Sequence, residues 1–379
     1  MTGIEEYPGR YALYNELHAR PFPELSPPCR AVMLTVKRPQ KAAERDRGED
    51  MEHLKKLLDR YGAAHPASDA NHHTVPMGRS ILKWEQHTEF VSYTLFADGV
   101  AKSPFDGSVF GYFPEDWLAE APGKRLTSAL VRVEPGGPED ARQRLQDVSH
   151  EWFVPESLAV AEVIDGTATV ASDFRIDEMG HVRMAVFAAP NTGPRRLGRV
   201  VQRLLEIETY KTASMLTLPV AREVSTRVSG LDKELTDIVH RMSASRGSDV
   251  ETLDRLLKMS AEIELLSTDT AFRFGAAEAY AAIVNQRIEV LREERVASRQ
   301  LFSEFMLRRF DPAMRTCRSA RSRLLELSAR AQSAANLLRT RVDVDSAQQN
   351  TKVLERMDER AALQLRLQET VEGLSVVAI

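Results

Sequence analysis

The chain has 379 residues, of which 43% are hydrophobic and 28% are charged, and its formal net charge is −4. This length and apolar content suffice for one large domain or two ordinary domains with buried cores. A protein that binds nucleic acid over a broad surface needs a clear excess of Lys and Arg to neutralise phosphates. The nearly balanced charge therefore argues against a nucleic-acid partner.

Cysteine usage and hydropathy exclude further classes. Cys29 and Cys317 are the two cysteines, far apart and without neighbours at zinc-ligand spacing, so we expect a reducing compartment and no disulfide framework. Residues 1–20 carry charges and lack the apolar run of a secretory signal. No stretch of about 18 apolar residues occurs, so no segment of this sequence is predicted to span a bilayer.

Proline and aromatic residues divide the chain into two parts. Every proline except Pro312 lies at or before Pro219, and no Phe, Tyr or Trp follows Asp311. Proline interrupts helices, and aromatic side chains favour strands and compact cores. We therefore predict a sheet domain over residues 1–196 and a long-helical part over residues 197–379.

The first part shows both strand and helix periodicities. The elements expected there, in chain order, are a strand at 30–37, a helix at 42–61, a polar loop at 66–76 with His72 and His73, a strand at 81–96, a strand at 126–133, a helix at 138–148, and two strands within 160–187 joined around Asp177–Gly180. This mixture predicts an α+β fold, with a mixed or antiparallel sheet and covering helices.

The second part has helical periodicity almost throughout. The helices expected there cover residues 200–218, 221–242, 249–266, 270–310 and 313–379, with proline breaks or bends near Pro219 and Pro312. Helices of this length are seldom stable alone and usually pack in coiled-coil-like bundles or oligomers.

The last helix carries an apolar seam in steps of three and four. The seam consists of Leu324, Leu327, Ala331, Ala334 and Leu338, falters at Arg341, Asp343, Asp345 and Gln349, and resumes at Leu354, Met357, Ala361 and Leu365. Two interpretations stay open. The seam either packs within the chain's own bundle or joins helices of several protomers in a homo-oligomer.

The strongest candidate for chemistry is the group Glu85, His87 and Glu89. Alternate residues of a strand share one face, so these three would lie beside Lys83 on one side of the sheet. Two carboxylates and an imidazole can bind a divalent cation or act as an acid and base. The alternative is a solvated polar face, opposite Trp84 and Phe90, with cross-strand ion pairs.

Two further pairs of residues are weaker candidates. His18 and Arg20 precede Pro21 in an extended or turning segment, where Arg20 could contact a carboxylate or phosphate. Asp173 and Arg175 lie two apart on an expected strand and would flank the Glu85 face if the strands were neighbours.

The helix expected at 200–218 presents polar residues at helical spacing. Arg203 and Glu206 can pair on its surface, and Glu206 with Tyr210 could form the wall of a site. Ordinary structural pairing is the alternative for the whole group, which includes Gln202 and Glu208. No phosphate-binding loop, nucleophile elbow, zinc-protease or dinucleotide motif occurs, and no cofactor is identified.

Long strings of the sequence resemble one bacterial family, the domain of unknown function 3422. The strings are LHARPF (17–22), WEQHTEF (84–90), SDFR (172–175), GRVVQRLLEIETY (198–210), RRFDPAMRTC (308–317), LLRTRVDV (337–344) and LQLRLQETVEGLSVVAI (363–379). The resemblance covers almost the whole chain and implies an uncharacterised, membrane-anchored protein. It supplies no catalytic residues.

The resemblance also implies that a membrane segment follows Ile379, so we expect the chain to be a piece of an anchored protein on the cytoplasmic side of the inner membrane. The order of parts is similar to that of CorA-type divalent-cation transporters, which is an analogy of architecture alone. The leading expectation is a non-enzymatic, oligomeric binding protein. A CorA-like transporter part, or an enzyme using Glu85, His87 and Glu89, are the alternatives.

Overall fold

The computed structural model describes residues 4–16, 21–40, 42–244 and 249–377. In chain order its elements are α1 (Arg10–Glu16), β1 (Cys29–Lys37), η1 (Ala42–Glu44), α2 (Arg47–Arg60), β2 (His72–Met77), β3 (Ser80–Gln86), β4 (Phe90–Asp98), η2 (Gly107–Tyr112), α3 (Glu115–Ala119), β5 (Lys124–Pro135), α4 (Pro138–Trp152), β6 (Ala159–Val163), β7 (Ala168–Ile176), β8 (Val182–Ala188), α5 (Pro194–Met215), α6 (Thr217–Ser243), α7 (Asp249–Glu289), β9 (Glu294–Arg295), α8 (Phe302–Arg309) and α9 (Asp311–Val377). The predicted α+β class is confirmed.

Contacts group these elements into two compact units. The sheet unit comprises residues 1–218 and 276–315, and the helical unit comprises residues 219–275 and 316–379. Helix α5 begins just before the boundary expected at residue 196 and belongs with the sheet, because its apolar stripe is buried on the strands. The last part of α7, β9 and α8 also belong to the sheet unit.

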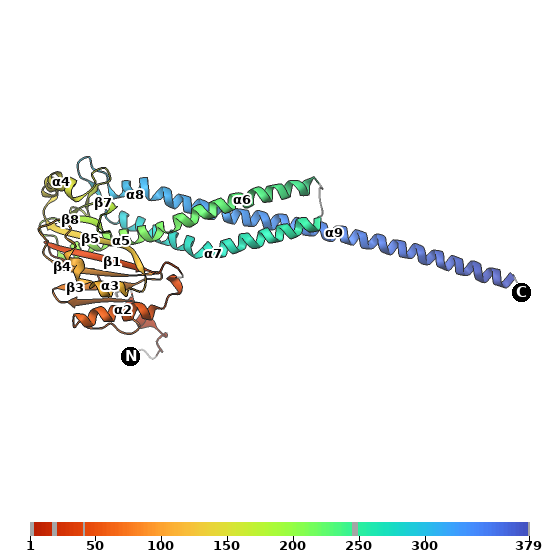
Figure 1. Cartoon of the computed structure of the whole chain (residues 1–379), viewed down its shortest axis with the longest axis horizontal. Coiled ribbons are helices and arrows are strands. Elements are labelled where there is room, and N and C mark those ends of the chain that lie inside the picture. Colours follow the sequence, from red (N-terminus) through yellow and green to blue (C-terminus); the bar gives the residue numbers. More distant parts are fainter. Residues whose placement is uncertain (1–3, 17–20, 41, 245–248, 378–379) are drawn as a thin grey trace. The chain divides into compact units, whose positions relative to one another are not determined.

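The sheet unit is built on a mixed sheet, visible in Figure 1. Within the described residues it has nine strands in the order β2-β3-β4-β1-β5-β8-β7-β6-β9. Strands β5 and β8 pair in parallel, and the pairs β1–β4, β1–β5, β3–β4 and β7–β8 are antiparallel. Both kinds of pairing in one sheet fit the expectation of a mixed sheet.

Helices cover both faces of this sheet. One face carries a core in which Trp84, Tyr93 and Leu95 pack with the apolar stripe of α2 and with Trp117 of α3. Towards β8 the same face packs against α4, through residues such as Phe187 and Trp152. The opposite face is covered by α5, whose Leu197, Val200 and Val201 are fully buried. Both faces of the sheet are therefore buried over much of their area, which explains why β1 and β4 are nearly continuous apolar runs.

Several predicted strands have different bounds, and each difference has a local cause. The strand expected at 81–96 is wrong, because the chain turns back at residues 87–89 and forms the hairpin β3–β4. The two strands expected within 160–187 are three, since a second turn at 164–167 separates β6 from β7. Strand β2 occupies part of the expected polar loop, with His72 opposite Glu85.

The helices also differ from the prediction in two places. Helix α5 ends at Met215, before Pro219, which lies in the first turn of α6, where its missing N–H is tolerated. The helices expected at 249–266 and 270–310 are instead one helix, α7, that ends at Glu289. A non-helical stretch with β9 and then the short α8 follow it.

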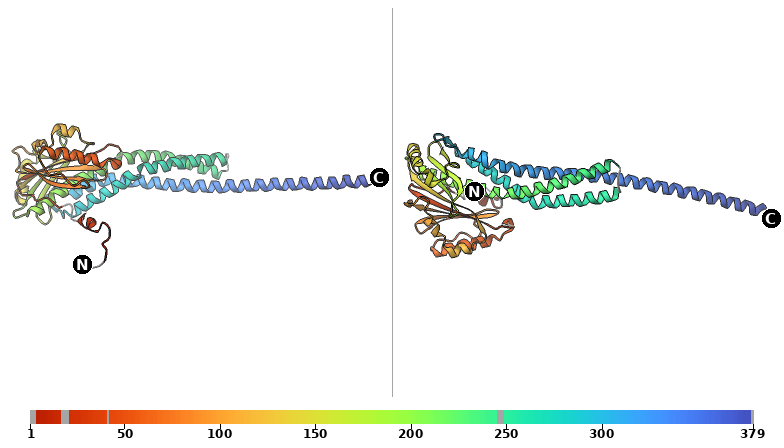
Figure 2. Two further views of the ribbon diagram at one scale, coloured as in Figure 1. Left: turned by 90° about the horizontal axis from the view of Figure 1, so that it is seen from below. Right: turned by 45° about the horizontal axis from the view of Figure 1, so that its top comes forward.

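The helical unit contains α6, the first part of α7 and most of α9, and the first part of α9 lies beside the other two helices (Figures 1 and 2). The first part of the α9 seam is buried there, with Leu324, Leu327 and Leu338 at most 2% exposed. Arg323 and Arg330 reach Ser229 and Asp232 of α6. The resumed seam behaves differently, since Leu354, Met357 and Leu365 are each more than 60% exposed. The polar interruption near Arg341 thus marks the point where burial stops.

A buried histidine in the core beneath α2 predicts a specific pH dependence. His53 donates from Nε2 to the Trp117 carbonyl (3.0 Å), and in the neutral ring Nδ1 accepts from the Tyr93 hydroxyl (2.9 Å). Burial lowers the pKa of His53. A lowered folded-state pKa means that protonation favours the unfolded chain, so stability present above about pH 6.5 is lost as the pH falls below it.

We expect His53→Gln, which can keep both hydrogen bonds without titrating, to flatten this loss on the acidic side. Urea unfolding at about pH 7.5 and about pH 5.5 measures the difference. Burial lowers the pKa of His181 in the same direction, so part of the loss remains. The exposed His150→Gln is the control. An equal acidic loss in the wild type and His53→Gln would contradict the assignment.

Candidate functional site

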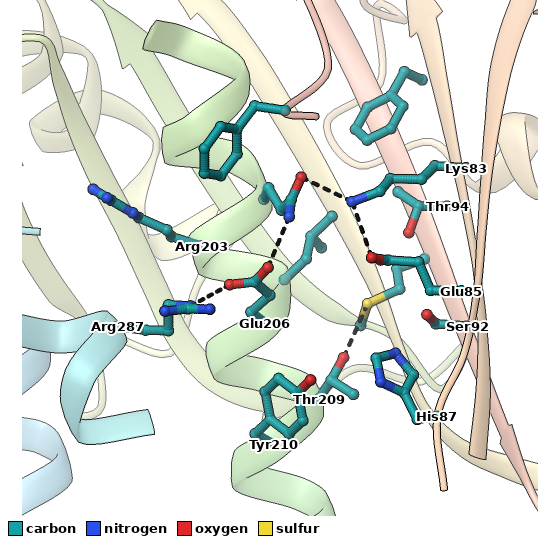
Figure 3. Close-up of a pocket in the computed structure, with 15 residues that line it drawn as sticks. Lys83, Glu85, His87, Ser92, Thr94, Arg203, Glu206, Thr209, Tyr210 and Arg287 are labelled. Carbon is teal, nitrogen blue, oxygen red and sulfur yellow. Dashed lines mark hydrogen bonds and ion pairs between the residues drawn. The ribbon is translucent and has the colours of Figure 1, made fainter. Parts of the chain in front are cut away.

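A cavity of about 270 Å³ lies between α5 and the face of the sheet that this helix covers. Its walls come from β1, β3, β4, α5 and the end of α7, together with Phe22 and His87, and all of them belong to the sheet unit (Figure 3). The volume is just below the range of about 300–1,000 Å³ that is typical of small-molecule pockets. Rigid elements therefore enclose a space that fits a small metabolite.

Polar contacts between α5 and the strands fix the helix beside the cavity. Buried Glu208 accepts from the Thr127 hydroxyl of β5 (3.1 Å), and Thr209 donates to the sulfur of Met33 in β1 (3.2 Å). Lys211 pairs with Glu208 at 2.8 Å. Because Thr209 and Met33 also line the cavity, the same contacts that dock the helix shape its floor.

Five side chains form a continuous polar chain along the cavity wall, drawn with dashed lines in Figure 3. Arg287 of α7 donates to Glu206, and Gln202 Nε2 donates to the other oxygen of Glu206 at 2.8 Å. Lys83 Nζ then donates to Gln202 Oε1 at 2.9 Å and lies 3.2 Å from Glu85. This polar chain links α7, α5 and β3 across the cavity.

A short segment before β1, residues 21–25, crosses α5 and contributes Phe22 to the lining of the cavity; we call it the strap. Leu25 N donates to Pro194 O at 3.1 Å, and the Arg199 guanidinium lies 5.1 Å from the centre of the Phe22 ring. The strap passes so close to Gly198 that an added Cβ would lie 1.6 Å from Pro23 O. Glycine at this helix position is what allows the strap to place Phe22 at the cavity.

The turn between β3 and β4 carries His87 to the cavity and is fixed from behind by Arg45. This arginine is buried and pairs with Asp50 at 2.8 Å. Its guanidinium also donates to the backbone carbonyls of Ala42, His87, Thr88 and Phe90. A rigid turn therefore positions the imidazole, whose ring lies 6.0 Å from that of Tyr210.

The structure separates the three residues of the leading prediction. Glu85 and His87 line the cavity, whereas Glu89 does not. Glu89 is 2% exposed, accepts from the Tyr280 hydroxyl at 3.1 Å and lies 3.6 Å from Lys37. The expectation of one shared strand face is wrong, because the turn at 87–89 lies between them. The solvated face proposed as the alternative is also wrong, since α5 covers it.

The weaker candidates lie elsewhere. Asp173 is buried in β7, where its carboxylate accepts from the backbone N–H groups of Val154 (2.8 Å) and Arg175 (3.1 Å). Arg175 donates to Ser157 at 2.8 Å. Four strands separate β7 from β3, so these residues do not flank the Glu85 face. His18 and Arg20 fall outside the described residues.

The α5 residues prove to be the richer part of the site. Glu206 and Tyr210 line the cavity, and Gln202 and Arg203, for which no site wall was predicted, line it as well. Glu206 pairs with Arg287 rather than with Arg203, which donates to Val290 O at 3.0 Å. Arg287 lies 81 residues from Glu206, and no local pattern could have indicated it. The same holds for Phe22, Thr94 and Phe96.

Metal and thiol chemistry gain no support from the geometry. The described residues include no group of three or more His, Cys, Asp or Glu placed to hold a metal ion. Both cysteines are buried, and burial raises the pKa of Cys29 to about 12 and raises that of Cys317. Neither thiol is therefore activated as a thiolate. Among the described helices, none has the length and apolarity needed to cross a membrane.

Comparison with known proteins gives the family and nothing finer. Residues 5–379 match the family described as "Protein of unknown function (DUF3422)", so the chain belongs to this family. The resemblance that the sequence strings predict is thereby confirmed. No curated protein and no solved structure matches the chain.

Proposed function

We propose that the protein is a binding protein rather than an enzyme, with the cavity beneath α5 as its ligand site. The observation that carries this proposal is the polar chain from Arg287 to Glu85, which runs along the wall of a cavity large enough for a small molecule. Paired charged side chains that are held on helices and strands can orient a ligand without a rearrangement of the protein.

A screen of small polar compounds by thermal shift and ligand-observed NMR tests this proposal. We expect hits that stabilise the wild type and are lost in Thr94→Trp, which would fill the cavity. Thr74→Trp, at an exposed position of β2, is the matched control and should keep the hits. Circular dichroism shows whether each variant is folded. Hits retained by folded Thr94→Trp, or no hits in the wild type, contradict the proposal.

The proposal extends to assembly and anchoring. The exposed apolar residues Leu354, Met357 and Leu365 support assembly of copies through α9, because a lone helix gains little from exposing them. The family resemblance supports a membrane segment beyond Ile379 and a location on the cytoplasmic side of the inner membrane. Analytical ultracentrifugation of this chain and of full-length protein in detergent tests the assembly. A monomer in both would contradict it.

An enzyme is the second candidate, favoured by one observation. Glu85 and His87 face the same cavity, and Tyr210 lies near the imidazole, so an acid, a base and a hydroxyl adjoin one space. Incubation of a bound compound with equimolar protein tests this candidate. Recovery of the compound unchanged contradicts it, whereas turnover that is lost in His87→Gln supports it.

The CorA-like alternative rests on the order of the parts of the chain. The described residues include no cluster of acidic residues or histidines placed to hold a metal ion. No structural observation therefore supports this alternative. Divalent-ion dependence of the thermal midpoint and ion flux by full-length protein in liposomes are its tests.

A further inference from the structure

The charges in the cavity wall are not balanced. Lys83, Arg203 and Arg287 supply three positive charges, and Glu85 and Glu206 supply two negative charges, so one positive charge is left over when His87 is set aside. A partly buried charge is costly unless an opposite charge compensates it. The composition of the wall therefore favours one negative charge on whatever fills the cavity.

The excess charge can be assigned to Arg203. Lys83 has Glu85, and Arg287 has Glu206. Arg203 makes no ion pair with any described carboxylate, and it donates a hydrogen bond to the neutral carbonyl of Val290 at 3.0 Å. A guanidinium has five N–H donors, so most of the hydrogen-bonding capacity of Arg203 is uncommitted.

Neighbouring cations increase the local positive potential. Burial lowers the pKa of Arg203, and the guanidiniums of Arg199 and Arg287 lower it further, against the attraction of Glu206, which raises it. Figure 3 shows Arg203 and Arg287 on the same side of Glu206, while Lys83 and Glu85 lie on the other side. The positive excess is thus concentrated at one end of the cavity.

The rest of the lining is partly apolar. Phe22, Met33, Phe96 and Leu205 contribute side chains to the wall, and Phe22 stacks beneath Arg199. A ligand with an apolar body could bury that body against these residues while its charged group meets the arginines.

We propose that the cavity binds a small organic monoanion, a carboxylate on an aryl or alkyl body, with the carboxylate facing Arg203. This inference rests on the proposed function, because it names the class of ligand for the same cavity. Arg203 is a binding residue in this arrangement, and Arg287 is positioned beside it by Glu206. A planar guanidinium can hold a carboxylate by two parallel hydrogen bonds.

Matched pairs of compounds test the charge directly. The probes are benzoate with benzamide, phenylacetate with phenylacetamide, and hexanoate with hexanamide, titrated by calorimetry into the whole chain. We expect at least one carboxylate to bind, and its amide to bind roughly tenfold or more weakly, because a charge-assisted hydrogen bond to Arg203 is lost. An amide that binds as tightly as its acid overturns the proposal.

Variants on one helix then test the residue. Arg203→Gln should weaken carboxylate binding roughly tenfold to a hundredfold and weaken amide binding much less, because the amide makes only a neutral-acceptor hydrogen bond to the guanidinium. Arg196→Gln, exposed on α5 and outside the cavity, should change neither. Arg203→Lys keeps the charge and loses the planar fork, so an intermediate loss is expected. Unchanged carboxylate binding in folded Arg203→Gln overturns the assignment, and if that variant fails to fold, the acid–amide comparison decides.

The outcomes separate this inference from the proposed function. Amides that bind as well as acids, with binding lost in Thr94→Trp, leave the cavity as a ligand site and refute the anion. Failure of every acid and amide to bind at about 10 mM refutes the anion, and with no hit in the broader screen it refutes the proposed function as well.

Discussion

Gly198→Ala is expected to destabilise the sheet unit by about 3 kcal/mol or more and to displace Phe22 from the cavity. The new Cβ would lie 1.6 Å from Pro23 O and 2.7 Å from Pro23 C. Both atoms belong to backbone, which cannot rotate away as a flexible side chain would. The strap must therefore move away from α5 or the helix must shift on the sheet.

Denaturant unfolding and probe binding measure the two effects separately. Gly230→Ala in α6 is the matched control, because it is also a helical glycine and no atom lies within 4 Å of its added Cβ. That control should be neutral or gain up to about 1 kcal/mol from higher helix propensity. Equal stability of the two variants would contradict the close approach of strap and helix.

Arg45→Met should cost about 3–5 kcal/mol, because it leaves the buried carboxylate of Asp50 without its ion-pair partner. It also removes the donors that hold the carbonyls of the β3–β4 turn. We expect faster amide hydrogen exchange at His87 and weaker binding of any ligand that touches the imidazole. Arg45→Lys should rescue little, since one ammonium cannot reach acceptors arranged around a guanidinium fork.

Urea titration measures the loss of stability, and exchange mass spectrometry measures the opening of the turn. Lys55→Met provides the control, because Lys55 pairs with Glu52 at 2.8 Å on the exposed surface of α2. Such a pair contributes less than about 1 kcal/mol. If both substitutions cost the same, Arg45 does not anchor the turn.

Much of the fold follows from local patterns in the sequence. The alternation of apolar and polar residues predicted strands β1 and β5, and apolar stripes at helical spacing predicted helices α2 and α4. The near absence of proline after residue 219 predicted the helical half. The apolar seam predicted in α9 is buried as far as Leu338, and the polar residues that interrupt the seam coincide with the end of this burial. These features depend on neighbouring residues, which is why the sequence reveals them.

The errors arise where distant residues decide the structure. The strand-like sequence of β3 continues into β4 through the polar residues 85–89, and the turn has no glycine or proline to mark it. Its carbonyls are bound by Arg45, more than 40 residues earlier. The cavity likewise needs Arg287 and Phe22, which only the folded chain brings to α5 and β3. Periodicity cannot report such contacts.

The candidate site was therefore only partly predictable. Glu85 and His87 were found for a reason that failed, since they do not share a strand face with Glu89. The α5 group was found for a sound reason, because residues three and four apart do face one side of a helix. Their common cavity depends on how α5 lies on the sheet, and one sequence does not specify that placement.

The polar chain in the cavity wall has a consequence for the kinetics of binding. Lys83 can only donate and an ionised Glu206 can only accept, so the Gln202 amide between them has a single satisfactory orientation. The donors and acceptors of the wall are thus arranged before a ligand arrives, and little rotamer entropy remains to be lost on contact. Binding of a ligand at the proposed site would then need little rearrangement of the wall, and selectivity between ligands should appear chiefly in their dissociation rates.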